Sequence, residues 1–167
     1  LSGISKIIGS SYDTYELFKD CDMSFDEIID ENGRKVYLTN SNYSLFIESK
    51  DRNVRESAFN TLYSKYKKYS NTFASLISTN MKELSTLAKL QKYDSAIQMS
   101  LFADDVDISV YDNLIDSVHE KINYIYEYYD LKKKLLGLDE LHLYDIYVPI
   151  VEEFDKKYNY EEAKKII

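Results

Sequence analysis

Three residues near the C-terminal end of the chain carry side chains that can transfer protons or bind metals: Glu140, His142 and Asp145. In an extended segment alternate side chains point to the same side, so Glu140 and His142 would lie together. As a metal site, however, three groups are few, and a histidine beside carboxylates more often forms a structural hydrogen bond. We therefore favour a structural role for this histidine and predict no metal site here.

Two other stretches match parts of metal-binding motifs. His119 and Glu120 begin like the zinc-peptidase sequence His-Glu-x-x-His, which points two histidines from one helix face at one metal. The second histidine is replaced by Asn123, and a carboxamide does not complete a catalytic zinc site. The stretch Asp105-x-Asp107-x-Ser109 is similar to the start of a calcium loop, but Val110 stands where that loop needs glycine. The sequence thus predicts no catalytic and no metal-binding residue in this chain.

Charge and composition limit the partners. The formal net charge is −8, so most of the surface would repel a nucleic acid. In the basic run 65–69 the tyrosines belong to an apolar helical stripe, which leaves its lysines as a solvated face. No apolar stretch approaches the length of a membrane span. The single cysteine, Cys21, allows no internal disulfide. We expect a cytoplasmic protein without nucleic-acid or membrane partners.

The elements that hold these residues are predicted to be helices. Four glycines and one proline in 167 residues disfavour a loop-rich or all-β fold. Near residues 25–38, two short apolar runs flank Asn32-Gly33, the dipeptide that tight hairpin turns prefer. The predicted fold is mainly α, a lobe of long antiparallel helices with one short β-hairpin.

Apolar residues spaced three and four apart predict a long helical run from about 51 to 92, with Ser49 as its N-cap. The pattern leaves open whether this run is one helix or two, with a bend near Ser70-Asn71 or Thr79-Asn80. A second long helix follows Asp107 and ends at Gly137. We expect an N-terminal region over 1–50 and a long-helix lobe over 51–167.

Six residues of this second helix, 124–129, put four tyrosines around a little more than one turn. Either the helix is buried on more than one side, or one side faces a groove. The last residues, 161–167, have the acidic start and basic end of a short helix without a closing glycine. We expect the chain to be a fragment of a longer protein.

The segment 133–149 closely resembles the oligoendopeptidase F branch of the thimet-type zinc oligopeptidases. Its sequence is Lys133-Lys134-Leu135-Leu136-Gly137-Leu138-Asp139-Glu140-Leu141-His142-Leu143-Tyr144-Asp145-Ile146-Tyr147-Val148-Pro149. Further matches follow the same order along the chain: Phe46-Ile47-Glu48-Ser49-Lys50-Asp51-Arg52-Asn53-Val54-Arg55 and Lys92-Tyr93-Asp94-Ser95-Ala96. The resemblance covers essentially the whole chain.

The resemblance implies a bacterial cytoplasmic metallopeptidase that cleaves short peptides in a channel between mostly helical lobes. In that family a helical His-Glu-x-x-His motif and a later glutamate bind one zinc, and the glutamate of the motif activates water. Those elements lie beyond the region matched here. Zn²⁺ is therefore expected in the full-length enzyme and not in this chain, which is expected to be inactive alone.

As a non-catalytic N-terminal region, the chain would wall the peptide channel and pack against the catalytic lobe of the same polypeptide. Its candidate contacts to a short peptide are His142, Tyr144, Asp145 and Tyr147, with buried packing as the alternative role. The rival hypothesis is a free-standing helical protein-interaction module related to the peptidase. Apolar surface left uncovered, for example beside residues 124–129, is expected to cause self-association.

Overall fold

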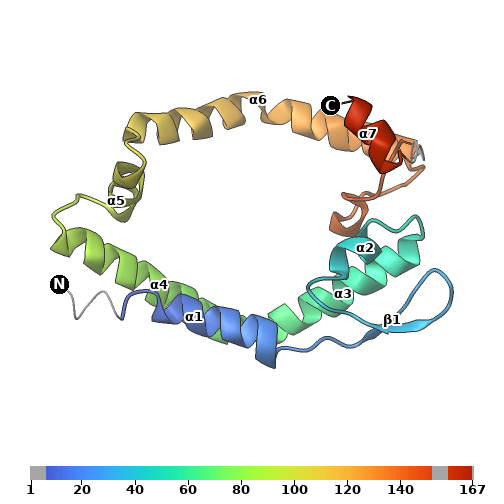
Figure 1. Cartoon of the computed structure of the whole chain (residues 1–167), viewed down its shortest axis with the longest axis horizontal. Coiled ribbons are helices and arrows are strands. Elements are labelled where there is room, and N and C mark those ends of the chain that lie inside the picture. The colour runs from blue at the N-terminus through green and yellow to red at the C-terminus, as the bar shows by residue number, and fades with distance from the viewer. Residues whose placement is uncertain (1–6, 152–157, 167) are drawn as a thin grey trace.

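A computed structural model describes residues 7–151 and 158–166 of the chain. Its helices follow one another around an open ring, with the hairpin at one corner (Figure 1). The elements in chain order are α1 (Ser10–Leu17), η1 (Phe18–Asp22), β1 (Glu27–Ile29), β2 (Lys35–Tyr37), α2 (Tyr43–Ile47), α3 (Arg52–Lys68), α4 (Ser70–Leu90), α5 (Ala96–Ala103), α6 (Ile108–Leu135), η2 (Leu143–Asp145) and α7 (Tyr160–Ile166). The predicted mainly α fold with one short hairpin is confirmed.

The hairpin lies where it was predicted. Its strands are antiparallel, with Ile28 opposite Val36. The loop between them spans 30–34, and Gly33 has a φ of 76°, in the left-handed region that favours glycine. The Asp30 carboxylate accepts hydrogen bonds from the backbone amides of Asn32 and Arg34, which fixes the loop.

A small core lies where α3 crosses the hairpin and α2. Ala58 on α3 is fully buried, and Ile28 and Leu38 are each about 2% exposed. The remaining buried members of this core come from both sides of the crossing: Met23, Phe25, Phe46, Val54 and Leu62. Because only one face of α3 and one face of the hairpin are apolar, the core fixes this corner of the ring and does not extend to the helices of its long sides, α4 and α6.

The run from 51 to 92 is two helices. It breaks at Tyr69, whose φ of −103° and ψ of 17° leave the helical region. The N-cap of α3 is Asp51, which accepts from the Asn53 amide, so the prediction of Ser49 was wrong. Ser49 instead accepts a hydrogen bond from the Asp51 amide in the preceding turn.

The predicted ends of α6 are confirmed. Asp107 caps its start by accepting from the Ser109 amide, and Gly137 follows its end with a φ of 64°. In the ring α4 and α6 run in opposite directions on facing sides (Figure 1). After Gly137 the chain returns to α3, so segment 138–149 closes the ring.

Helix α6 is largely uncovered. It packs against α5 at its start, and apolar side chains along its length stay exposed, among them Val110, Leu114, Val118, Tyr124, Ile125, Tyr126, Tyr128 and Leu131. The chain exposes 13050 Å² in all, whereas a compact monomer of 19.6 kDa exposes about 8,600 Å². The excess is larger than one side of an ordinary protein–protein interface, about 800 Å². Among the helices that the structure describes, none is long and apolar enough to cross a membrane.

Candidate functional site

The ring closes at an ion cluster formed by Asp145, Arg52 and Arg55, here called the Asp145 cluster. Asp145 is fully buried at the end of η2 and binds both arginines: Arg52 donates to both carboxylate oxygens, and Arg55 donates to Oδ1. The distance from its Oδ1 to Nη2 of Arg55 is 2.7 Å, and that from Oδ2 to Nη2 of Arg52 is 3.0 Å. These contacts join segments about 90 residues apart in the sequence.

Local structure places each member of the cluster. Arg52 and Arg55 lie three residues apart in the first turn of α3, so they share one face. Arg55 also donates to the backbone carbonyls of Ser49 and Lys50, which end the loop before α3. On the other side, Asp145 Oδ2 accepts from the backbone amide of His142, so the same carboxylate caps η2.

Aromatic rings cover the cluster. The His142 and Tyr144 rings are stacked, with centroids 5.0 Å apart and planes at 17°. The Arg52 guanidinium lies 5.3 Å from the Tyr144 centroid, within cation–π distance. On its remaining side Tyr144 meets the edge of Phe59 from α3, at 5.9 Å. The stack thus joins the imidazole of His142 to the guanidinium of Arg52 through the buried Tyr144 ring.

The electrostatics keep Asp145 ionised. Burial alone raises the pKa of its carboxyl, but hydrogen bonds from Arg52, Arg55 and the His142 amide outweigh burial and hold the pKa below its usual range. Nearby, burial and the charge of Arg55 lower the pKa of Lys132, whose ammonium donates to the carbonyl of Ile146. A carboxylate held by two arginines is a poor general base, so the cluster is suited to positioning and not to proton transfer.

The four candidate peptide contacts lie in different environments. Asp145 and Tyr144 are buried in the cluster, so a peptide would not touch them directly. Tyr147 is exposed, and His142 is half-buried. His142 lines a pocket of about 460 Å³ between the end of α6 and segment 141–146, whose other lining residues are Tyr129, Asp130, Lys133, Leu141, Leu143 and Ile146.

The described residues, 7–151 and 158–166, bring no three His, Cys, Asp or Glu side chains together around a possible metal position. His142 Nε2 lies 3.7 Å from a carboxylate oxygen of Glu140, which makes a pair and not a set of ligands. His119 is exposed on α6, and Asp107 is engaged as a helix cap.

Sequence reasoning missed both arginines of the cluster and also Glu83. The Glu83 carboxylate on α4 accepts from the Gly9 amide and from the hydroxyls of Ser10 and Ser11, which ties the start of α1 to α4. The spacing of Arg52 and Arg55 was visible, but nothing in the sequence joined them to a residue some 90 positions later. Contacts between residues so far apart in the sequence can be identified only once the fold is known.

Comparison with known proteins decides the family. The model of peptidase family M3 matches residues 45–167. The chain belongs to peptidase family M3. Oligopeptidase PepF of Bacillus subtilis (strain 168) is 37% identical over 164 residues, which are 98% of this chain and 24% of that protein. The oligoendopeptidase F homolog of Lactococcus lactis subsp. lactis (strain IL1403) is 37% identical over 165 residues, 99% of this chain and 27% of that protein.

A solved structure agrees with these matches. The crystal structure of oligoendopeptidase-F from Enterococcus faecium superposes with a TM-score of 0.89 at 39% identity, over 92% of this chain and 30% of that chain. This chain therefore spans about a quarter of the length of the curated relatives it matches. The family resemblance stated from segment 133–149 is confirmed.

Proposed function

We propose that this chain is a non-catalytic wall of a cytoplasmic zinc oligoendopeptidase that hydrolyses short peptides. The observation that carries the proposal is the match to peptidase family M3 over most of a chain that spans about a quarter of its relatives. The described residues of this chain do not fit a zinc site, because Glu140 and His142 supply two ligands and no third joins them. The zinc and the catalytic residues would then come from other parts of the polypeptide.

The uncovered face of α6 supports the role of a wall. Leu114, Val118 and Ile125 lie on an exposed apolar face of this helix. The surface in excess of a compact monomer, about 4,500 Å², is above one side of a large, permanent interface, roughly 1,000–2,500 Å². We infer that the catalytic part of the same polypeptide covers this face, and that self-association replaces that contact when the chain is alone.

The peptide would pass the pocket beside the Asp145 cluster. Lys133 and Asp130 in its lining supply one charge of each sign, suited to a peptide carboxylate and a peptide amine. His142 and the exposed Tyr147 offer hydrogen-bonding groups to an extended backbone. Tyr144 and Asp145 act behind them as positioning residues, since they hold the imidazole and the segment that carries it.

A first test uses the purified 167-residue chain. We expect no stoichiometric zinc by elemental analysis and no hydrolysis of internally quenched short peptides. Stoichiometric zinc, or hydrolysis that a chelator abolishes, would place the catalytic site in this chain and overturn the proposal.

A second test places the chain in a longer enzyme, replacing the matching quarter of the Bacillus subtilis relative. Lys133→Ala should raise KM for short peptides several-fold with little change in kcat, because the side chain would bind the peptide without touching the reacting atoms. The neighbouring Lys134→Ala is the matched control, since Lys134 is exposed outside the pocket. Equal KM values for the two variants would remove the pocket from the peptide path.

A further inference from the structure

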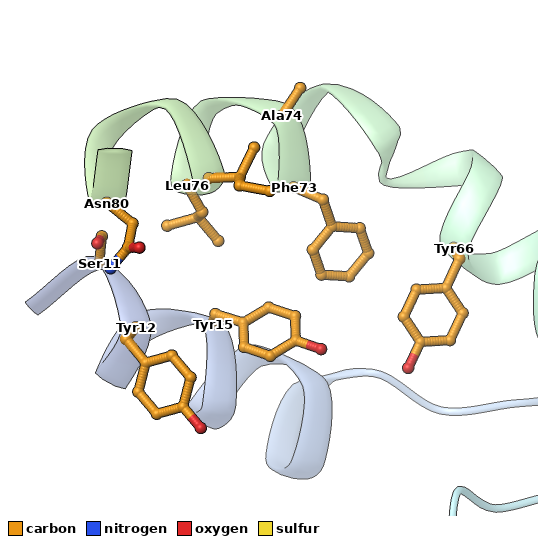
Figure 2. A pocket seen from close by; sticks show the side chains of 9 residues that line it. Ser11, Tyr12, Tyr15, Tyr66, Phe73, Ala74, Leu76 and Asn80 are labelled. Carbon is orange, nitrogen blue, oxygen red and sulfur yellow. The ribbon is translucent and has the colours of Figure 1, made fainter. Parts of the chain in front are cut away.

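A second pocket lies between α1, the end of α3 and the first half of α4. Figure 1 shows α1 alongside α4. The volume of the pocket is about 500 Å³, within the range of small-molecule sites, roughly 300–1,000 Å³. The residues that line it are Ser11, Tyr12, Tyr15, Tyr66, Phe73, Ala74, Leu76, Ile77 and Asn80. Figure 2 shows the side chains of Tyr15, Phe73 and Leu76 between the two helices, with Tyr66 at one end and Ser11 and Asn80 at the other.

The two walls of this pocket are joined at both ends. Glu83 fixes the start of α1 on α4 through a 2.9 Å hydrogen bond from the Ser11 hydroxyl and a 3.2 Å bond from the Gly9 amide. At the other end Phe73 contacts Tyr15 edge to face at 5.8 Å and stacks on Tyr66 at 5.4 Å. Both ends of the pocket are thus anchored, while Tyr12 and Ile77 in its lining are 54% and 60% exposed, so the pocket opens to solvent.

The lining is mainly apolar, and its polar groups are the carboxamide of Asn80 and the hydroxyls of Ser11 and three tyrosines. No charged side chain lines the pocket, in a chain where 30% of the residues are charged. The half-buried carboxamide of Asn80 has no hydrogen-bond partner in the part of the chain that the structure describes. The atoms of this amide can reach solvent, so a ligand group that donates to it or accepts from it would take the place of water.

We propose that this pocket binds a small neutral aromatic molecule of about two rings that carries one hydrogen-bonding group. The rings would lie among Tyr15, Phe73 and Leu76, and the polar group would pair with Asn80. The absence of charged lining excludes a strongly charged ligand.

The test is an NMR titration of the 167-residue chain with labelled Leu and Ile methyl groups. The probe is 2-naphthol, which has two rings and one hydroxyl, and its charged counterpart is 2-naphthoate. We expect 2-naphthol to shift the methyl signals of Leu76 and Ile77 saturably, with a dissociation constant below about 1 mM. The carboxylate should bind at least about tenfold more weakly, because it would be desolvated without a partner charge.

Variants locate the binding. Ala74→Phe fills the pocket and should abolish the shifts, whereas Ser75→Phe adds the same ring one position away, outside the lining. Asn80→Ala should weaken 2-naphthol about fivefold, the effect of one hydrogen bond. Shifts that survive Ala74→Phe, equal binding of the carboxylate, or no saturable shift would each overturn the proposal.

Two further outcomes would assign the pocket to another occupant. Ligand-free shifts of Ile77 on dilution would mean that a second copy fills it. Loss of 2-naphthol binding after the chain is fused to the remaining part of the Bacillus subtilis relative would mean that this remaining part covers the pocket. Either result would overturn the small-molecule proposal without touching the peptidase function.

Discussion

The Asp145 cluster makes a quantitative prediction about stability. Asp145→Asn keeps the shape of the side chain and removes its charge, which leaves the Arg55 guanidinium, only 4% exposed, beside a neutral amide. Removing one partner of a buried ion pair costs about 3–5 kcal/mol. Arg52 is 39% exposed, so its share is smaller, at most about 1 kcal/mol. Because domains of this size are stable by about 5–15 kcal/mol, we expect a large loss of stability.

The assay is urea unfolding followed by circular dichroism. With an m-value of about 1–3 kcal/mol per molar urea, the Asp145→Asn midpoint should fall by about 1–5 M. Hydrogen exchange should rise first in segment 138–149, since this segment loses its anchor to α3, while the core around Ala58 stays protected.

The matched control is Glu140→Gln, a carboxylate in the same segment that is exposed and whose ion-pair partner among the described residues is His142, at 3.7 Å. We expect it to change the free energy of unfolding by less than about 0.5 kcal/mol. A loss below about 1 kcal/mol for Asp145→Asn, or equal losses for the two variants, would refute the view that this buried pair closes the ring.

Three further predictions concern pH, the core and α6. Although burial raises the pKa of Asp145, hydrogen bonds from its arginines hold that pKa below its usual range. The stabilisation that ionised Asp145 provides is therefore present above about pH 4 and is lost as pH falls through the lowered pKa. Asp145→Asn should lack this loss in its acid unfolding curve. Ile28→Ala should cost about 2–5 kcal/mol and Ile29→Ala less than about 1 kcal/mol in urea unfolding, since these neighbours are 2% and 49% exposed. In analytical ultracentrifugation the chain should self-associate as its concentration rises. Leu114→Glu, at a residue 64% exposed on α6, should weaken this association, and Asn113→Glu should not. A monomer at every concentration would contradict the α6 prediction.

Much of the fold was predictable because it depends on local signals. The Asn32-Gly33 dipeptide located the hairpin, and Asp107 and Gly137 bounded α6, since turns and caps involve residues close in sequence. The break at Tyr69 was left open, because the apolar stripe continues from α3 into α4 without a change of spacing. Ser49 was predicted as the cap in place of Asp51. Serine and aspartate cap helices about equally well, so residue type alone does not distinguish the two positions.

The site was less predictable, because it depends on contacts between distant segments. The carboxylate of Asp145 looked like a candidate for peptide contact, and only the fold shows that Arg52 and Arg55 engage it. The open shape of the ring also could not be predicted, since the spacing of apolar residues along α6 is the same whether or not a partner covers that face. The tyrosines of 124–129 illustrate this: Tyr124, Tyr126 and Tyr128 are exposed, and Tyr129 lines the pocket beside His142.

The central claim is that this chain is a wall of an M3 oligopeptidase and works only with the rest of such an enzyme. The most direct measurement is kcat/KM for a quenched short peptide, in the Bacillus subtilis relative with its matching quarter replaced by this chain. We predict hydrolysis well above that of the relative with this quarter deleted, and a loss of that gain with Leu114→Glu on α6 but not with Asn113→Glu. Activity no higher than that of the deleted enzyme, in a folded chimera that retains zinc, would contradict the account.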